Sequence, residues 1–187
     1  MGTRHRPARP ELRAARGLLQ AEEGAVAVTD VDKALARLGL QLPAVVPPVA
    51  AYQPAVRAGD FVYTSGQLPM VDGALAATGK VGAEVDPELG YELARICGLN
   101  ALAAVASVAP LDQVVQIVKV VGFVASAPGF TGQPKVVNGA SELLGEVFGE
   151  AGVHARSAVG VAELPLGAPV EVELIARLAP GAKTVLV

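Results

Sequence analysis

The strict alternation of side chains over residues 170–178 constrains the fold of this chain more than any other feature of its sequence. Successive side chains of a β-strand project to opposite faces of a sheet, so the pattern predicts one strand with two unlike faces. We expect the apolar face to pack against helices. The other face carries Glu171 and Glu173, about 7 Å apart along the strand. Spacing alone leaves two interpretations of these carboxylates open, a solvated surface and a functional site. The apolar set is Val170, Val172, Leu174, Ala176 and Leu178, and the other set is Glu171, Glu173, Ile175 and Arg177.

Upstream of this strand, the sequence predicts helices and strands in an order that lacks a regular βαβ repeat. A short helix is expected after Thr29, which can cap free N–H groups, and Gly39 suits its left-handed end. Long helices are expected from Asp86-Pro87 to about residue 108 and from Gln133-Pro134 to about residue 149. The expected strands are 51–56, 61–65, 113–125 and 157–164, and residues 66–85 are expected to form a long loop. This order predicts an α+β fold, in which a mixed sheet carries two long helices on one face.

The chain divides into one domain and its flanking segments. Residues 1–27 are expected to be a disordered extension, residues 28–49 a short helix and a proline-rich linker, residues 50–178 the domain, and residues 179–187 a tail. Residues 1–16 hold five arginines and one acidic residue, a net charge of +4. Because the whole chain carries −3, the remainder carries −7. An arm that binds nucleic acid or an anionic membrane is the alternative for residues 1–27.

Composition excludes several classes of protein. One cysteine, Cys97, and two histidines cannot form a disulfide framework or a cysteine- or histidine-rich zinc site, so we expect no metal and no cofactor. Hydrophobic residues make up 52% of the chain and charged residues only 18%, which favours an oligomer that hides apolar surface. Polar residues interrupt the apolar stretches, so we expect no membrane span. The apolar stretch at residues 17–20 is too short for a secretory signal, and we expect a cytoplasmic location.

Few residues remain as candidates for chemistry. The sequence contains no phosphate-binding loop, dinucleotide-binding glycine motif, zinc-protease motif or nucleophile elbow. A Ser-His-Asp triad would have to use His154, and spacing indicates no partner for it. What remains are Tyr63–Pro69 after a strand and His154–Ser157 before one. The guanidinium of Arg156 could bind a carboxylate through two parallel hydrogen bonds, or it could form a structural ion pair.

At these residues the sequence resembles the RidA/YjgF family of reactive-intermediate deaminases, which older descriptions call endoribonuclease L-PSP. The resemblance covers residues 50–178 and is closest to a divergent branch described as endoribonuclease/chorismate-mutase-like. His154 stands where many members have proline, and Ser126 where many have aspartate. The similar segments are Ala51-Tyr52, Ala55-Val56, Gly59–Pro69, Asn100, Asn138, Ala155–Val159, Leu164-Pro165 and Val170–Glu173.

The resemblance implies a chorismate-mutase-like homotrimer with three clefts between its subunits, and it implies roles for five residues. Arg156 would bind the carboxylate of the substrate, and Glu171 would position or activate water. Tyr52 and Ser65 would line the cleft, and the backbone carbonyl of Ala158 would accept a hydrogen bond from the nitrogen of the substrate. The implied function is hydrolysis of reactive 2-imino or enamine acids to 2-keto acids and ammonia.

Two other functions fit the same fold. One is a non-catalytic trimer that binds a small carboxylate-bearing metabolite or acts as a regulator. The other is the ribonuclease of the older name, which we disfavour because an acidic domain with 4% aromatic residues offers neither a basic groove nor a stacking platform for RNA.

Overall fold

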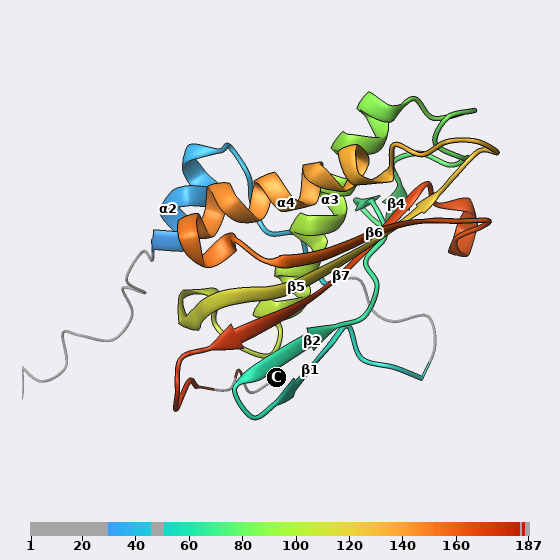
Figure 1. Cartoon of the computed structure of the whole chain (residues 1–187). Coiled ribbons are helices and arrows are strands. Elements are labelled where there is room, and N and C mark those ends of the chain that lie inside the picture. Colours follow the sequence, from blue (N-terminus) through green and yellow to red (C-terminus); the bar gives the residue numbers. More distant parts are fainter. Residues whose placement is uncertain (1–29, 46–50, 184, 186–187) are drawn as a thin grey trace, which may run out of the picture.

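The computed structural model describes residues 30–45, 51–183 and 185, in which five strands form one mixed sheet with helices on one side (Figure 1). The predicted extension 1–27 and the predicted cap Thr29 lie outside the described residues. The strand order is β1-β2-β7-β5-β6, and only the β5–β6 pair is parallel. The strands are β1 (Ala55–Ala58), β2 (Phe61–Thr64), β5 (Val114–Ala125), β6 (Ala155–Val161) and β7 (Val170–Leu178). The α+β class predicted from the order of elements is therefore confirmed.

Three α-helices and several short elements complete the described fold. Two long helices cover one face of the sheet, and the short α2 packs beside α4 (Figure 1). The helices are α2 (Asp30–Arg37), α3 (Pro87–Ala106) and α4 (Gln133–Phe148), the short strands are β3 (Met70–Val71) and β4 (Ala74–Leu75), and the 3₁₀ turns are η1 (Leu111–Gln113), η2 (Gly149–Gly152) and η3 (Pro165–Gly167).

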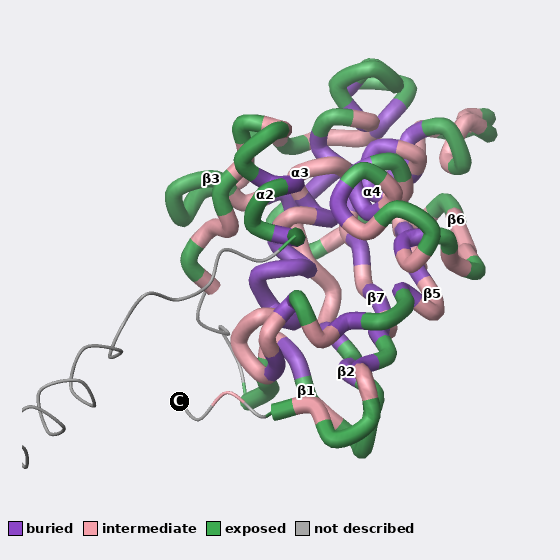
Figure 2. The backbone as a smooth tube through the Cα atoms, turned by 90° about the vertical axis from the view of Figure 1, so that its left-hand side faces the viewer, coloured by how far each residue is buried: buried purple, intermediate pink, exposed green. Residues whose placement is uncertain are grey.

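Strand β7 has the two unlike faces that its sequence predicts. Its five apolar side chains face the helices and are at most 2% exposed. Glu171, Glu173 and Ile175 lie on the opposite face and are partly exposed. Figure 2 shows that buried residues gather where α3 and α4 meet the sheet. The apolar face of β7 therefore forms the floor of the core.

The ends of the helices follow the predicted signals. The Oδ1 atom of Asp86 accepts a hydrogen bond of 2.7 Å from the backbone N–H of Leu89, which caps α3. Gly39, with φ of +68°, follows the end of α2 in the left-handed conformation. Helix α3 ends at residue 106, two residues before the predicted end.

Three strand or loop predictions differ in detail from the structure. Strand β1 begins at Ala55 rather than at residue 51. Proline at position 54 has no N–H to donate to a neighbouring strand, and only its carbonyl forms a hydrogen bond, with the N–H of Ser65. Strand β6 begins at Ala155, where its parallel pairing with β5 starts, two residues before the predicted start. The predicted loop 66–85 contains the β3–β4 hairpin, which the side-chain amide of Asn100 ties to α3 through the carbonyls of residues 68 and 70.

Small residues bring α3 and α4 into close contact. At Gly139 of α4 a Cβ atom would overlap the backbone carbonyl of Tyr91, and at Gly98 of α3 a Cβ atom would make a tight contact of 3.3 Å with Ala140. At the exposed side of this contact, Arg95 forms an ion pair with Glu146.

Among the described helices, only α3 is long and apolar enough to cross a membrane. Of its most apolar window, 61% is buried inside the fold, as in a core helix, and one such helix is weak evidence for a membrane protein.

The face of the sheet opposite the helices is uncovered in the single chain, and we call it the open face. It carries large apolar side chains that are between a third and a little over a half exposed. In cross-strand register, Val56, Tyr63, Ile175 and Lys119 form one row across β1, β2, β7 and β5. Phe61 and Val159 lie on the same face by alternation.

We expect Gly139→Ala to lower the free energy of unfolding by about 2 kcal/mol or more, because the new Cβ atom has no space between the two helices. Gly145→Ala is the matched control in α4, since a Cβ atom there meets nothing within 4 Å. The control should gain about 0.5–1 kcal/mol from higher helix propensity. Urea unfolding of the two variants measures the difference, and equal effects would show that the helices do not approach as closely as described.

Candidate functional site

The structure places the five predicted site residues in two groups that are separated by β5. Glu171 lies at the start of β7, against Gly66 of the loop that contains Ser65, and Ser65 is hydrogen-bonded to Gln53, the neighbour of Tyr52. Arg156 and Ala158 lie on β6, the edge strand at the other side of β5. We call these groups the glutamate half-site and the arginine half-site.

In the glutamate half-site, the Glu171 carboxyl group lies directly against the backbone of Gly66. A Cβ atom at position 66 would overlap this carboxyl group, so any larger residue there would displace the Glu171 side chain from its present position. Reciprocal backbone hydrogen bonds of 2.8 and 3.0 Å between Gln67 and Val172 hold the loop on β7. The Ser65 hydroxyl donates to the carbonyl of Gln53 at 2.7 Å, which ties the loop to the segment carrying the half-exposed Tyr52.

Burial raises the pKa of the Glu171 carboxyl group, and the neighbouring charge of Glu173 raises it further. Its carboxylate forms no hydrogen bond and no ion pair with any described residue. A half-buried carboxyl group with a raised pKa is suited to proton transfer with a bound water or substrate.

In the arginine half-site, three uncharged oxygen atoms hold the guanidinium of Arg156. Its Nη1 atom donates to Asn138 Oδ1 at 2.8 Å and to Ser141 Oγ at 3.0 Å, and its Nη2 atom donates to the carbonyl of Pro134 at 3.2 Å. All three acceptors belong to α4. Within the described part of the chain, Arg156 has no carboxylate partner, so the alternative of a structural ion pair is not supported there.

The contacts of Arg156 leave two of its five N–H donors without a described acceptor, the Nε–H and one Nη2–H. The Nε and Nη2 atoms share one edge of the guanidinium, on which an N–H of each can run nearly parallel. Two parallel donors match the two oxygens of a carboxylate. The half-site therefore presents an uncompensated positive charge and a preformed pair of donors to an anion.

Ala158 lies on the same strand as Arg156, two residues further along β6. The N–H of Ser126 bonds to the carbonyl of Val161 beside the end of β5, so this carbonyl points into the sheet. Backbone groups alternate along a strand, which directs the carbonyl of Ala158 outward from the sheet edge. It is thus available as a hydrogen-bond acceptor beside the arginine half-site.

The two half-sites of one chain cannot act on the same small molecule. Arg156 is in register with Val120 and Leu174, whose side chains are buried under the helices, whereas Glu171 lies on the open face. Two strand spacings, about 10 Å, also separate β6 from β7. A single chain therefore provides two incomplete parts of the predicted site.

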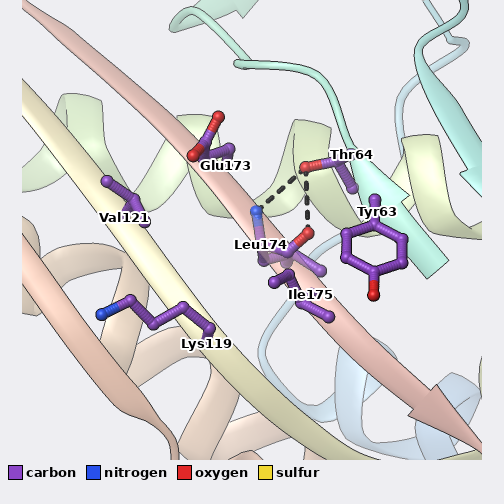
Figure 3. A pocket seen from close by; sticks show the side chains of 7 residues that line it. All are labelled: Tyr63, Thr64, Lys119, Val121, Glu173, Leu174 and Ile175. Carbon is purple, nitrogen blue, oxygen red and sulfur yellow. Dashed lines mark hydrogen bonds between the residues drawn. The ribbon is translucent and has the colours of Figure 1, made fainter. Parts of the chain in front are cut away.

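The pocket in the open face is not the predicted site. It has a volume of about 170 Å³, and none of the five predicted residues lines it (Figure 3). In Figure 3 the amine of Lys119 points away from Glu173, and this amine donates to the Ser157 hydroxyl at 2.9 Å.

Among the described residues, no group of three or more histidine, cysteine or acidic residues could hold a metal ion.

Sequence reasoning named the segments that contain Gly66 and His154 as candidates but gave neither residue a role, it did not consider Ser141, and it noted Asn138 only as part of a resemblance. Asn138 and Ser141 are three residues apart on α4, a spacing that places both on one helix face. Two polar residues at that spacing in an apolar helix were a usable signal. No local pattern indicates that Gly66 lies against a carboxyl group 105 positions away.

We expect Glu171→Gln to stabilise the protein at neutral pH but not in acid. Below the ordinary carboxyl pKa of 4.5, Glu171 is protonated in the folded and unfolded states, so its burial has no ionic penalty. As pH rises through the raised pKa of the folded state, the buried charge lowers the free energy of unfolding. The urea midpoint of the variant should exceed that of the wild type at about pH 7.5 and equal it at about pH 3.5. An equal gain at both pH values would contradict the raised pKa.

Comparison with known proteins connects these features to one family. The sequence profile of the family described as "YjgF/chorismate_mutase-like, putative endoribonuclease" matches residues 32–178. Protein TCP17 of Trypanosoma cruzi is 44% identical over 146 residues, which cover 77% of this chain and 91% of that protein.

Solved structures agree with this match. A "putative endoribonuclease" from Shewanella oneidensis has a TM-score of 0.76 and 34% identity, with 79% of this chain and 99% of that chain covered. TdcF of E. coli, solved with bound serine, has a TM-score of 0.51 and 25% identity, with 73% and 93% covered. The chain therefore belongs to the YjgF/chorismate-mutase-like family, as its resemblance to RidA/YjgF proteins predicted.

Proposed function

We propose that this protein binds a small carboxylate-bearing metabolite at Arg156 and hydrolyses 2-imino or enamine acids to 2-keto acids and ammonia. One observation carries the proposal. Uncharged acceptors on α4 fix the guanidinium and leave one donor on Nε and one on Nη2 without a described acceptor, with no described carboxylate to neutralise its charge. This is the arrangement that a substrate carboxylate requires, and a purely structural arginine would not require it.

The proposed reaction needs orientation, one water and proton transfer. Arg156 would hold the carboxylate, and the outward carbonyl of Ala158 would accept a hydrogen bond from the imine nitrogen. An enamine acid first tautomerises to the 2-imino acid, as a proton moves from nitrogen to carbon. Water adds to the C=N carbon, the C–N bond of the resulting carbinolamine breaks, and ammonia leaves with the 2-keto acid. The Glu171 carboxyl group, with its raised pKa, would take a proton from the attacking water and return one to the leaving nitrogen.

A second copy of the chain would complete this site, and we propose that the protein is a homotrimer with its sites between subunits. The two half-sites of one chain face away from each other, so each needs a partner. The open face presents several partly exposed large apolar side chains, which is unusual for the surface of a monomer. A closed ring pairs the arginine half-site of each subunit with the glutamate half-site of the next.

A related structure supports a ligand of this size. TdcF of E. coli was solved with serine, a small molecule that carries both a carboxylate and a nitrogen. A non-catalytic role remains the second candidate, because the arginine half-site is fully formed without any contribution from Glu171. A binder would use Arg156 alone, whereas the hydrolase requires both half-sites.

We expect Arg156→Ala to weaken the binding of 2-oxobutyrate, a 2-keto acid product, by at least about 30-fold, because removal of one partner of a desolvated ion pair costs about 2–5 kcal/mol. Arg156→Lys should rescue binding poorly, since lysine cannot form two parallel hydrogen bonds. Arg37→Ala, an exposed arginine of α2, is the control. Calorimetric titration measures the affinities, and unchanged binding in Arg156→Ala would refute the role of the guanidinium.

Mixed trimers test whether the half-sites of different subunits combine. Arg156→Ala and Glu171→Gln subunits should each be inactive as pure trimers, with a loss of roughly 100-fold or more. After random mixing in equal amounts, about one quarter of the sites receive an intact arginine from one subunit and an intact glutamate from the next. Recovery of about a quarter of wild-type hydrolysis is expected. No recovery, in trimers shown by mass spectrometry to be mixed, would place each site within one subunit.

A further inference from the structure

The structure assigns to His154 and Ser141 a role as positioning residues that orient the guanidinium of Arg156. Neither residue is expected to touch the substrate. One part of the test rests on the proposed function, because it measures how the orientation of Arg156 affects the affinity for a carboxylate. The other part follows the same orientation by nuclear magnetic resonance, without any ligand.

The first hydrogen bond of the series joins His154 to a backbone carbonyl. The Nδ1 atom of His154 lies 2.6 Å from the carbonyl oxygen of Gly152. A carbonyl only accepts hydrogen bonds, so Nδ1 carries a proton, and in the neutral imidazole Nε2 is then an acceptor. Gly152 is itself fixed, because a Cβ atom there would overlap the carbonyl of Leu144 in α4. The 3₁₀ turn η2 is thus packed tightly on α4, and it sets the tautomer of His154.

The tautomer of His154 in turn sets the direction of the next two hydrogen bonds. Ser141 Oγ lies 3.0 Å from His154 Nε2, so the hydroxyl proton points to the histidine. The lone pairs of the same oxygen are then free to accept from Arg156 Nη1, also at 3.0 Å. The donors therefore follow one order, from Arg156 to Ser141, from Ser141 to His154, and from His154 to Gly152. We call this series the His154–Ser141 relay.

The relay matters because a long arginine side chain loses much conformational freedom when it binds an anion. Asn138 and Ser141, one turn apart on α4, accept the two hydrogens of Nη1 from different directions and so fix the plane of the guanidinium. If His154 did not hold the hydroxyl proton of Ser141, this proton could rotate toward Arg156 and repel its donor. A guanidinium fixed before binding spends less free energy on ordering.

The same contacts argue against Ser141 as a nucleophile, although it lies beside a histidine. Its oxygen already accepts from Arg156, and Arg156 has no further Nη1 hydrogen for a developing oxyanion. Ser141 therefore serves as an acceptor for Arg156, and His154 serves to orient the hydroxyl of Ser141.

A set of four variants tests the relay against a merely structural role. Ser141→Ala removes the hydroxyl, and Ser141→Thr keeps it. His154→Leu removes the acceptor, and His154→Gln offers an amide oxygen near the position of Nε2. Because a guanidinium that is no longer fixed must be ordered when it binds, we expect Ser141→Ala and His154→Leu each to weaken 2-oxobutyrate binding about 10-fold. The Thr and Gln variants should stay within about threefold of the wild type.

The double variant Ser141→Ala/His154→Leu distinguishes a relay from two independent contributions. If His154 acts only through Ser141, the double variant should bind no more weakly than Ser141→Ala alone. Additive losses of about 100-fold would overturn the relay. The expected loss is in affinity and KM, with kcat changed little at saturating substrate, because Arg156 still binds once the ligand is in excess.

Nuclear magnetic resonance of the full chain tests the relay without a ligand. In the wild type, the imidazole of His154 should show the Nδ1–H tautomer, and the Nη hydrogens of Arg156 should give separate, slowly exchanging signals. In His154→Leu these signals should merge, and in His154→Gln they should stay separate. Merged signals in the wild type, or unchanged signals in His154→Leu, would overturn the relay.

These readouts separate the relay from the proposed function. If the wild type fails to bind 2-oxobutyrate but shows the expected resonances, the proposed function fails and the relay stands. If Ser141→Ala does not fold, the wild-type tautomer and the His154→Leu and His154→Gln pair still decide the outcome.

Discussion

The packing of β7 against the helices is the constraint on which the remaining structure depends. This strand lies in the middle of the sheet between β2 and β5, and five of its side chains are buried beneath the helices. Because side chains alternate, burial of that set leaves Glu171 and Glu173 on the open face. A shift of register by one residue would bury both carboxylates and expose the core. The position of the candidate acid–base group therefore follows directly from the packing of the core.

Much of the fold follows from local sequence, whereas the site depends on contacts between distant residues. The alternation of residues 170–178 predicts the two faces of β7, and Asp86-Pro87 predicts the start of α3. The β3–β4 hairpin was missed because each of its strands has only two residues, which is too short for a periodic pattern. The three acceptors of Arg156 come from a helix 15 to 22 residues earlier in the chain, and no local spacing shows which side chains of a helix face one edge strand. The resemblance to a family identified Arg156 and Glu171, but only the register of the sheet shows that one chain holds them apart.

The separation of the two half-sites suggests how assembly and chemistry are related in this protein. The arginine half-site is held by three hydrogen bonds and has no described carboxylate partner, so it is suited to anion recognition. The glutamate half-site holds a carboxyl group whose pKa is already raised by burial in the single chain. Contact with a second copy would bury Glu171 further and raise its pKa more, which would bring the acid–base group closer to neutral pH when the site is complete. In our proposal, the apolar open face drives the assembly and the charged groups carry out the chemistry.

The most direct test of the proposed hydrolysis is the rate at which 2-aminoacrylate, generated in place from serine by a dehydratase, is converted to pyruvate. We expect the full-length wild-type protein to accelerate pyruvate release. Arg156→Ala should not accelerate it at the same protein concentration. If the wild type binds 2-oxobutyrate but leaves the rate of pyruvate release unchanged, the protein is a binder of small carboxylates and the proposed hydrolase function is wrong.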